Sequence, residues 1–265
     1  MVSDVKKGVK TTRYPTSDDT RTLTCRIHGK YEGIVTEING RKIEAICPEC
    51  LEDERKSELN KHVEEHMRRK RIDIFNQSCV PKRYQGIKFN DFHPVCDEAE
   101  ELLELMQRYV KNYHLVLMHG TSFLFSGGTG TGKTTIGTAV LNGVMMIGYT
   151  GVYVSSLNLL SKVKRSWVNG ATVSQDEIIE SYVAYDLLVL DEIGKGQMSA
   201  KEKGIIFSLL DRRHEEVKPT IGITTYSEQK IKSLIDEDAV RRLTTGGGCT
   251  IKFTWPNYEL SRSKF

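Results

Sequence analysis

The stretch FLFSGGTGTGKTTIGTAV, residues Phe123–Val140, contains the glycine-rich loop that decides the fold of this chain. An apolar run ends there in a tract of glycine and threonine, and Lys133 is followed by two threonines. The pattern G-x-x-x-x-G-K-[ST] is fitted in full by Gly127, Gly132, Lys133 and Thr134. The loop follows an expected strand and opens an expected helix, which is the context that this phosphate-binding motif requires.

Each residue type in this loop suits the triphosphate of a nucleotide. The glycines let successive backbone N–H groups curve around the β-phosphate oxygens, and the following helix adds its positive N-terminal end. Lys133 brings a charge to the β- and γ-phosphates, and the Thr134 hydroxyl can bind Mg2+. The residues predicted to bind ATP are Gly127, Gly128, Thr129, Gly130, Thr131, Gly132, Lys133, Thr134 and Thr135.

A second motif, YDLLVLDEIG at residues 185–194, supplies two adjacent carboxylates. The four apolar residues 187–190 predict a buried strand, and Asp191 stands at its carboxyl end, where doubly wound sheets bind their ligands. We expect Asp191 to hold Mg2+ through water. Glu192 beside it can polarise a water molecule for in-line attack on the γ-phosphate. The two motifs together predict ATP hydrolysis, with Lys133, Asp191 and Glu192 in the catalytic site.

Alternating strands and helices predict an α/β fold for residues 76–265. Helical segments lie between most of the five strand candidates. This rhythm is typical of a parallel sheet that helices cover on both faces. The strand candidates are SFLFSG, GVYVSS, LLVLDE, TIGITTY and TIKFTW.

The composition excludes several classes of protein. A chain of 265 residues with 38% hydrophobic and 28% charged residues is typical of a soluble globular protein. No apolar run approaches the roughly 20 residues that span a bilayer, and the N-terminus lacks the apolar region of a secretory signal. We therefore expect a cytoplasmic protein with no membrane partner. A net charge of +3 does not by itself indicate nucleic-acid binding.

The first 75 residues differ in character from the rest. Residues 1–20 are polar and predict a flexible tail. Residues 21–50 combine glycines with alternating apolar positions, which indicates short strands and turns. Residues 51–75 lack glycine and proline and are dense in Glu, Lys and Arg, so we expect a helix. A solvated connecting helix is the simpler interpretation of this segment, and a helix that binds a partner is the alternative.

Two pairs of potential metal ligands lie in this part of the chain, Cys25-Arg-Ile-His28 and Cys47-Pro-Glu-Cys50. Each two-residue gap places both side chains of a pair on one turn. Three thiolates and one imidazole form a closed tetrahedral Zn2+ site, and the strand-like stretch between the pairs indicates a zinc ribbon. Such a small module depends on the metal for its stability. The alternatives are a coincidence of ordinary side chains and a redox C-x-x-C, for which no thioredoxin-like βαβ pattern is present.

Small-molecule kinases also contain a P-loop, but they need an arginine-bearing lid that closes over both substrates. The arginines here cluster elsewhere, in DRRHEE and DAVRRL late in the chain, which argues against a kinase. From about Val80 to Tyr258 the sequence resembles the DnaC family of AAA+ replicative helicase loaders, which is close to the IstB-like transposition ATPases. The first matching segment and the C-terminal block carry the specificity, because many families share the other motifs. The matching segments are VPKRYQGIKFNDF, FSGGTGTGKTT, GVYVSSLNLLSKVKRSW, LLVLDEIG, LLDRRHEEVKPTIGITTYS, AVRRL and FTWPNYELSR.

This resemblance implies an AAA+ core whose five-stranded parallel sheet has the order 5-1-4-3-2, with Mg-ATP at the tips of strands one and three. It implies that Arg242, with Arg241 as the alternative, is an arginine finger for the γ-phosphate of a neighbouring subunit. The family commonly has an Asn as polar sensor on the fourth strand, where this sequence has Tyr226. Thr225 is then the nearest hydroxyl that can order the attacking water. Only ten residues follow Trp255, too few for the helical lid of larger AAA+ initiators.

Basic residues beside an aromatic ring in LLSKVKRSW suit single-stranded DNA, because phosphate contacts and base stacking bind DNA of any sequence. The alternative is a helix with an exposed basic face and a buried tryptophan. The loop around Lys195 is a second, weaker candidate. The candidate DNA contacts are Lys162, Lys164, Arg165 and Trp167.

The sequence thus predicts an ATP-dependent helicase loader with the cofactors ATP, Mg2+ and Zn2+. The zinc ribbon and the charged helix would bind the replicative hexameric helicase. The AAA+ domains would assemble around ATP and deliver the helicase to single-stranded DNA during replication initiation. One alternative is an IstB-like ATPase that bends duplex DNA and recruits a transposase. Another is a zinc-ribbon binding module whose ATP site regulates an interaction without significant turnover.

Overall fold

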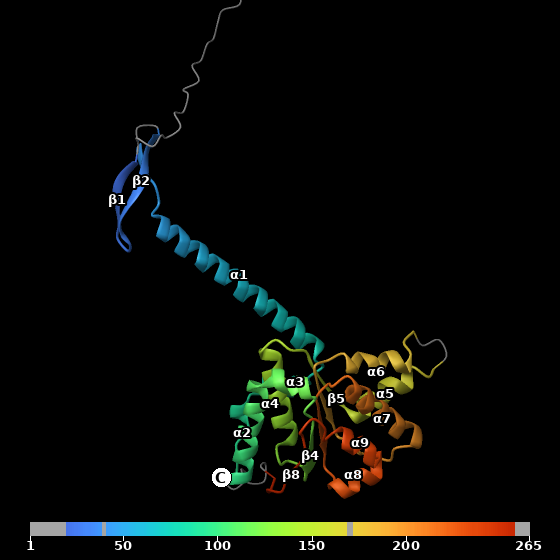
Figure 1. Cartoon of the computed structure of the whole chain (residues 1–265). Coiled ribbons are helices and arrows are strands. Elements are labelled where there is room, and N and C mark those ends of the chain that lie inside the picture. Colours follow the sequence, from blue (N-terminus) through green and yellow to red (C-terminus); the bar gives the residue numbers. More distant parts are fainter. Residues whose placement is uncertain (1–19, 39–40, 169–171, 258–265) are drawn as a thin grey trace, which may run out of the picture. The chain divides into compact units, whose positions relative to one another are not determined.

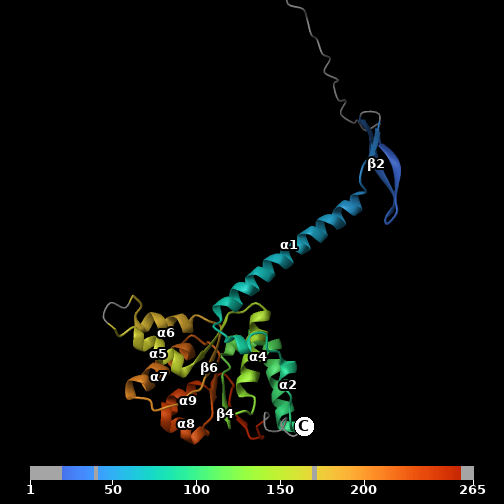
Figure 2. The same ribbon diagram turned by 180° about the vertical axis from the view of Figure 1, so that it is seen from behind.

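The computed structural model describes residues 20–38, 41–168 and 172–257. The chain divides into two compact units, Met1–Arg68 and Arg69–Phe265, and the division falls inside a long helix (Figures 1 and 2). The predicted tail, residues 1–20, lies outside the described part of the chain except for its last residue. Among the described residues, no helix is both long enough and apolar enough to cross a membrane.

The first unit contains a three-stranded antiparallel sheet in the order β1-β2-β3. A tight turn joins the first two strands, where Cys25 pairs with Gly29, and Gly29 has a positive φ of 82° that glycine adopts readily. The short strands expected for residues 21–50 are confirmed. Their bounds are Thr20–Cys25 for β1, Gly29–Ile38 for β2 and Arg41–Glu44 for β3.

Helix α1 (Pro48–Gln77) corresponds to the helix predicted for residues 51–75. It begins earlier than predicted because proline suits the first turn of a helix, where its missing N–H donor is not needed. Side chains 51–62 are all exposed, which agrees with the high charge of this segment. Near the end of the helix, Ile74 is buried and joins the apolar core of the second unit.

The second unit is built on a five-stranded parallel sheet in the order β5-β6-β7-β4-β8. The strand that precedes the P-loop is β4, the first strand of this sheet along the chain, so the order is the predicted 5-1-4-3-2. The α/β fold and all five strand predictions are confirmed. The strands are β4 (Phe123–Gly127), β5 (Gly151–Ser155), β6 (Leu187–Asp191), β7 (Thr220–Thr224) and β8 (Thr250–Phe253).

Side chains of each strand alternate between two apolar layers, one on either face of the sheet. In β4, Phe123 and Phe125 belong to one layer and Leu124 to the other. The helices that contribute to the first layer include α2 (Asp97–Lys111), α3 (Tyr113–His119) and α4 (Lys133–Met146). Those of the second layer are α5 (Ser156–Arg165), α6 (Gln175–Val183), α7 (Ala200–Glu215), α8 (Glu228–Ile235) and α9 (Glu237–Arg242). The sheet is therefore covered on both faces, as predicted (Figure 1).

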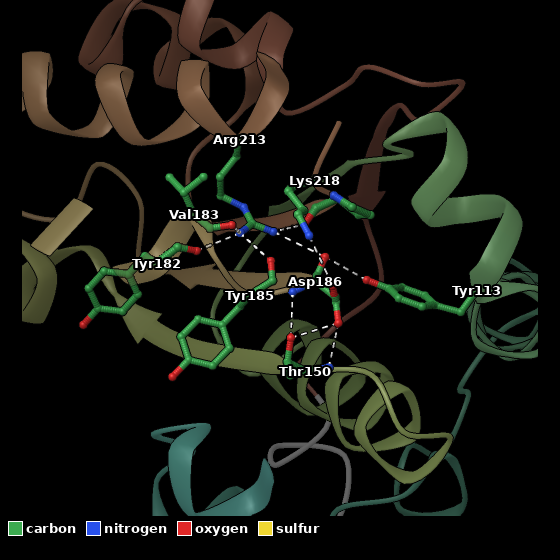
Figure 3. A network of polar contacts seen from close by, with 9 residues as sticks. Tyr113, Thr150, Tyr182, Val183, Tyr185, Asp186, Arg213 and Lys218 are labelled. Atoms are coloured by element: carbon green, nitrogen blue, oxygen red, sulfur yellow. Dashed lines mark hydrogen bonds and ion pairs between the residues drawn. The ribbon is translucent and has the colours of Figure 1, made fainter. Parts of the chain in front are cut away.

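A fully buried arginine joins several elements at the end of the sheet opposite the P-loop, where strands β6 and β7 begin. The guanidinium of Arg213, near the end of α7, points into a cluster of backbone carbonyls (Figure 3). Burial lowers its pKa to about 10, so the side chain remains charged at neutral pH. It donates hydrogen bonds of 2.6–3.5 Å to Thr220 Oγ1 and to the carbonyl oxygens of Tyr182, Val183, Tyr185, Asp186 and Pro219.

Candidate functional site

The glycine-rich loop lies at the carboxyl end of β4 and leads into α4, as the sequence predicts. The space around two of its glycines admits no side chain. A Cβ atom on Gly127 would collide with the backbone of Phe253, and one on Gly132 would lie 2.7 Å from the ring of Phe92. Gly132 also has a φ of 89° and caps α4. The bare backbone can therefore approach a phosphate closely at the positive end of this helix.

Lys133 opens α4 and is buried, with 5% of its surface exposed. Its Nζ donates hydrogen bonds to the carbonyl of Gly128 and to Thr131 Oγ1, the latter at 3.2 Å. Burial lowers the pKa of Lys133, and the negative charge of Asp191 opposes that shift. Both hydrogen-bond acceptors are uncharged, so a phosphate at this position would stabilise the buried ammonium more than they do.

Asp191 ends β6 and accepts three hydrogen bonds. Its Oδ2 accepts from Thr134 Oγ1 at 2.9 Å and from the Tyr153 hydroxyl at 2.8 Å. Its Oδ1 accepts from the backbone amide of Glu192 at 2.6 Å. The two predicted magnesium ligands, Thr134 and Asp191, are thus in direct contact although 57 positions separate them. Hydroxyl and carboxylate oxygens are ligands that Mg2+ prefers, so this pair fits the ion.

A cavity of about 680 Å³ lies over the P-loop and the carboxyl ends of β6 and β7, a size that suits a nucleotide. One wall comes from the segment between α1 and α2, which includes η2 (Lys82–Tyr84) and η3 (Phe89–Asp91). Asn142 on α4 anchors this wall, because its Nδ2 donates to the carbonyls of Tyr84 and Ile87 at 3.1 and 2.9 Å. The lining residues that the sequence motifs did not identify include Arg83, Tyr84, Phe92, His93, Tyr153, Lys195 and Trp255.

Glu192, the predicted base, lines the same cavity. Its φ of 56° is uncommon for a residue other than glycine, and its carbonyl accepts a hydrogen bond of 2.7 Å from Ser156 Oγ that holds this conformation. Its carboxylate pairs with Nζ of Lys195, with Oε1 at 2.5 Å from the ammonium. Hydrogen bonding to Glu192 raises the pKa of Lys195. Glu192 therefore lines the same cavity as the P-loop, with a cation beside its carboxylate.

The predicted sensor residues follow β7 directly. Thr225 and Tyr226 both line the cavity, and Thr225 is exposed to it. The backbone of Tyr226 is held on both sides, because its carbonyl accepts from Ser126 Oγ at 2.7 Å and its amide donates to Thr224 Oγ1 at 3.2 Å. A hydroxyl and a phenol thus occupy the positions expected from the sequence register.

The sequence profile of the IstB-like ATP binding protein family matches residues 98–239, which is more than half of the chain. The chain belongs to this family. It is 28% identical over 185 residues to the replicative helicase loader DnaC of Escherichia coli, and the match covers 70% of this chain and 74% of that protein.

Solved structures extend the likeness to the fold. A crystal structure of the DnaC helicase loader matches with a TM-score of 0.57 at 21% identity, covering 66% of this chain and 100% of that chain. The replication initiator DnaA, in a structure bound to AMPPCP and single-stranded DNA, matches with a TM-score of 0.54 at 19% identity, covering 66% and 50%. This IstB-like protein is therefore an ATP-binding P-loop ATPase with an AAA+ fold.

The candidate arginine finger of the IstB-like protein lies outside its own nucleotide cavity. Arg242 ends α9, and its Nε donates to Asp211 Oδ1 on α7 at 2.9 Å. About a quarter of each side chain is exposed, 24% for Arg242 and 26% for Asp211. Arg241, the alternative, pairs with Asp238 on its own helix at 2.8 Å. The two arginines thus differ, because Arg242 is anchored to another helix and Arg241 makes a local surface pair.

The four predicted zinc ligands come together in the first unit. The ligand atoms of Cys25, His28, Cys47 and Cys50 all lie within 4.8 Å of one another. Nδ1 of His28 is 3.3 Å from Cys50 Sγ and 3.7 Å from Cys47 Sγ, and Cys25 Sγ is 3.4 Å from Cys50 Sγ. A tetrahedral zinc ion with bonds of about 2.0–2.3 Å holds its ligand atoms about 3.5–3.8 Å apart. The cluster therefore fits a zinc ion in both ligand type and spacing.

Two further contacts favour metal binding at this cluster. Nε2 of His28 pairs with Oδ2 of Asp53 on α1 at 3.2 Å. A carboxylate on the outer nitrogen is a common partner of metal-binding histidines, because it fixes the tautomer that presents the other nitrogen to the metal. Backbone hydrogen bonds from His28 and Ile27 lower the pKa of the Cys25 thiol to about 6, whereas hydrogen bonding to Cys25 raises the pKa of the Cys50 thiol to about 12, so Cys25 is the thiolate of this pair. Asp53 carries no spacing signal in the sequence.

The candidate DNA contacts lie at the end of α5 and in the turn after it. Trp167 is 38% exposed, so the alternative of a buried tryptophan is wrong. Its Nε1 donates to Gln175 Oε1 at 3.1 Å, and Nζ of Lys201 lies 3.5 Å from the centre of its ring. An exposed ring beside a cation can stack on a base while the cation contacts a phosphate.

The basic residues of α5 are not equivalent. Nζ of Lys164 pairs with Oε1 of Glu202 on α7 at 2.6 Å, and Glu202 is largely buried. Lys162 and Arg165 are exposed, and Nζ of Lys162 lies 5.1 Å from the ring centre of Tyr182. Lys162 thus lies against α6, whereas Lys164 lies against α7 and is engaged in an ion pair.

Proposed function

We propose that this protein is an ATP-dependent loader of the replicative hexameric DNA helicase and that it delivers the helicase to single-stranded DNA during replication initiation in the cytoplasm. The similarity to the replicative helicase loader DnaC carries this proposal, because it extends over 70% of this chain and 74% of that protein. The output of such a protein is the placement of a partner. ATP therefore acts as a switch between binding states as well as a substrate.

Hydrolysis in the nucleotide cavity follows from the groups that line it. Lys133 and the loop amides would bind the β- and γ-phosphates, and Thr134 and Asp191 would hold Mg2+, which would supply positive charge to neutralise the phosphates. Glu192 accepts a proton from the water that attacks the γ-phosphate. Thr225 orders that water. The contact of 2.9 Å between Thr134 and Asp191 supports this assignment.

Self-assembly would complete the site. Arg242 lies outside its own cavity, which favours a role at the γ-phosphate of a neighbouring subunit. The bond from Nε to Asp211 fixes the stem of the side chain and does not use the two Nη groups, which can bind phosphate oxygens in a bidentate manner. We therefore assign ATP-dependent oligomerisation to the second unit.

The zinc ribbon and α1, residues 21–75, form the proposed helicase-binding module. The ribbon exposes apolar side chains around the metal cluster: Ile27 is 80% exposed and Ile46 is 68% exposed. Ile27 lies in the turn between Cys25 and His28, and Ile46 directly precedes Cys47. A zinc ion would hold both isoleucines in place, and a protein surface can cover them.

Single-stranded DNA is the proposed nucleic-acid partner of the α5 surface. The exposed ring of Trp167 and the cations of Lys162 and Arg165 supply the stacking and phosphate contacts that such binding needs. Lys164 remains a candidate, although its ion pair with Glu202 must be exchanged for a phosphate contact. The similarity in fold to DnaA, whose structure holds single-stranded DNA, supports this choice of partner.

Copurification tests the proposal, with purified protein and the replicative helicase of the same host mixed with ATP and a single-stranded oligonucleotide. We expect a complex that contains both proteins, and we expect single-stranded DNA to compete for binding better than a duplex of equal length. A variant with Ile27→Ser and Ile46→Ser provides the matched control, because it alters the ribbon surface and leaves the nucleotide cavity intact. It should bind ATP normally and lose the helicase.

An IstB-like transposition ATPase is the second candidate, favoured by the family profile over residues 98–239. Such a protein would bend duplex DNA and recruit a transposase. Preference for duplex over single-stranded DNA, together with no capture of the helicase, would support this candidate and contradict the loader proposal.

A further inference from the structure

A buried tyrosine on β5 contacts the carboxylate that is assigned to Mg2+. Tyr153 is 8% exposed, and its hydroxyl donates to Asp191 Oδ2 at 2.8 Å. β5 and β6 pair in parallel, with Tyr153 opposite Val189. Asp191 stands two positions after Val189 and therefore extends from the same face of the sheet, within reach of a long side chain. The register of two neighbouring strands thus produces the contact.

The Asp191 carboxylate is almost saturated with donors. A carboxylate has about four acceptor sites. Three are occupied, because Thr134 and Tyr153 donate to Oδ2 and the amide of Glu192 donates to Oδ1. The remaining site is the one available to a cation or to its bound water. The donors therefore determine the direction in which Asp191 can bind a metal ion.

Tyr153 is held by contacts that do not involve the P-loop. Its backbone amide donates to the carbonyl of Ser78 at 2.9 Å, and its ring lies 6.2 Å from that of Tyr84, tilted by 40°. The side chain also lines the nucleotide cavity. The phenol is therefore fixed before nucleotide or cation arrives, whereas Thr134 is part of the loop that binds the phosphates.

We propose that Tyr153 is a positioning residue for the divalent cation that accompanies ATP. Its hydroxyl holds the Asp191 carboxylate in the orientation that binds the cation together with Thr134. This inference rests on the proposed role of Asp191 and Thr134 in holding Mg2+ and involves no step of helicase loading. Tyr153 does not act on the reacting atoms, and its effect passes through Asp191.

The test compares Tyr153→Phe with a matched control, Tyr109→Phe. The hydroxyl of Tyr109 is also buried and donates to the carbonyl of Thr121 at 2.8 Å, but Tyr109 does not line the cavity. The affinity of each protein for a fluorescent ATP analogue is measured with Mg2+ and with EDTA, and the ratio of the two affinities is the metal coupling. Binding of Mn2+ in the presence of nucleotide, followed by electron paramagnetic resonance, provides a second readout.

A hydrogen bond to a charged acceptor corresponds to about tenfold in an equilibrium constant. We therefore expect the metal coupling of Tyr153→Phe to fall about tenfold and its Mn2+ affinity to fall by about the same factor. Its affinity in EDTA should stay within about twofold of wild type, and Tyr109→Phe should keep the wild-type coupling. In an Asp191→Asn background, Tyr153→Phe should cause no further loss, because the two act through one contact.

Wild-type coupling in Tyr153→Phe would overturn the proposal. An equal loss of affinity with and without metal would also overturn it, because that result indicates a structural role. Absence of coupling in the wild type would overturn the magnesium assignment and this proposal together. Neither helicase nor DNA is present in these assays, so a failure of the loading proposal is recognised separately.

Discussion

Replacing Arg213 with methionine should strongly destabilise the second unit. The guanidinium is fully buried and donates to five backbone carbonyls and one hydroxyl, and Figure 3 shows those of Tyr182, Val183, Tyr185 and Asp186. Arg213→Met leaves these acceptors without that donor. A buried acceptor without a partner costs about 1–3 kcal/mol. Two of the carbonyls keep another donor, because Asp186 O accepts from the Tyr113 hydroxyl and Pro219 O accepts from the Leu188 amide. Taking the low end for the other three gives a loss of about 3 kcal/mol, a substantial share of the 5–15 kcal/mol that stabilises a typical domain.

Urea unfolding measures this loss. With a slope of about 2–3 kcal/mol per molar urea, a loss of about 3 kcal/mol lowers the midpoint by about 1–1.5 M. The preceding residue provides the control, because Arg212 forms surface ion pairs with Asp176 and Glu180. Such pairs contribute at most about 1 kcal/mol. Arg212→Met should therefore move the midpoint by less than about 0.5 M.

Arg213→Lys separates the charge from the geometry. An ammonium has three donors on a point charge, whereas the planar guanidinium has five in a fixed fork, so lysine cannot satisfy the same acceptors. We expect Arg213→Lys to be destabilised nearly as much as Arg213→Met. Equal urea midpoints for Arg213→Met and Arg212→Met would refute the reasoning, because the buried network would then contribute no more than a surface pair.

Four other predictions address the metal, the reaction, the assembly and the pH dependence. Chelation of zinc should unfold the ribbon, seen by circular dichroism, and leave ATP affinity nearly unchanged; metal analysis should give one zinc per chain, and its absence under reducing conditions would contradict the assignment. Glu192→Gln should keep ATP bound and suppress hydrolysis, whereas Lys133→Ala should weaken binding itself; two variants that bind and hydrolyse like wild type would show the site to be misassigned. Arg242→Ala should bind ATP but fail to hydrolyse it, and mixing it with Lys133→Ala should restore activity, whereas a finger acting within one chain predicts no rescue at any ratio. Hydrogen bonds from Lys164 and Ser199 lower the pKa of Glu202 to about 2, so the contribution of the Glu202 carboxylate to stability is present above pH 4.5 and declines as the pH falls toward 2. The difference in urea midpoint between wild type and Glu202→Gln should shrink over that range. A constant difference would refute the linkage.

The sequence predicts those parts of the structure that local pattern determines. Five apolar segments separated by helical ones predict the strands. The glycine-rich loop at Gly127–Thr134 predicts both the turn between a strand and a helix and the nucleotide phosphates that bind there. Cys25, His28 and the two later cysteines reveal the metal cluster because their spacing reflects the geometry of one ion. In each case the residues that define the feature are close in sequence or tied to one chemical group.

The remaining features depend on contacts that local pattern does not encode. Tyr153 belongs to a buried strand, and nothing in GVYVSS distinguishes a tyrosine that packs from one that donates to Asp191. Arg213 is one of two adjacent arginines on a helix, and its burial follows from how α7 packs against α6 and the sheet. Arg242 and Asp211 lie on two different helices and are 31 positions apart in the sequence, so only the tertiary fold brings the two side chains into contact.

Loading of the helicase onto closed circular single-stranded DNA tests the central claim most directly. The circle has no free end, so the hexameric helicase can encircle it only if its ring is opened. We predict that this protein, with ATP and the helicase of its own host, leaves the helicase bound to the circle after gel filtration, and that Lys133→Ala protein does not. Equal retention of the helicase with and without this protein, or no retention in either case, would contradict the account.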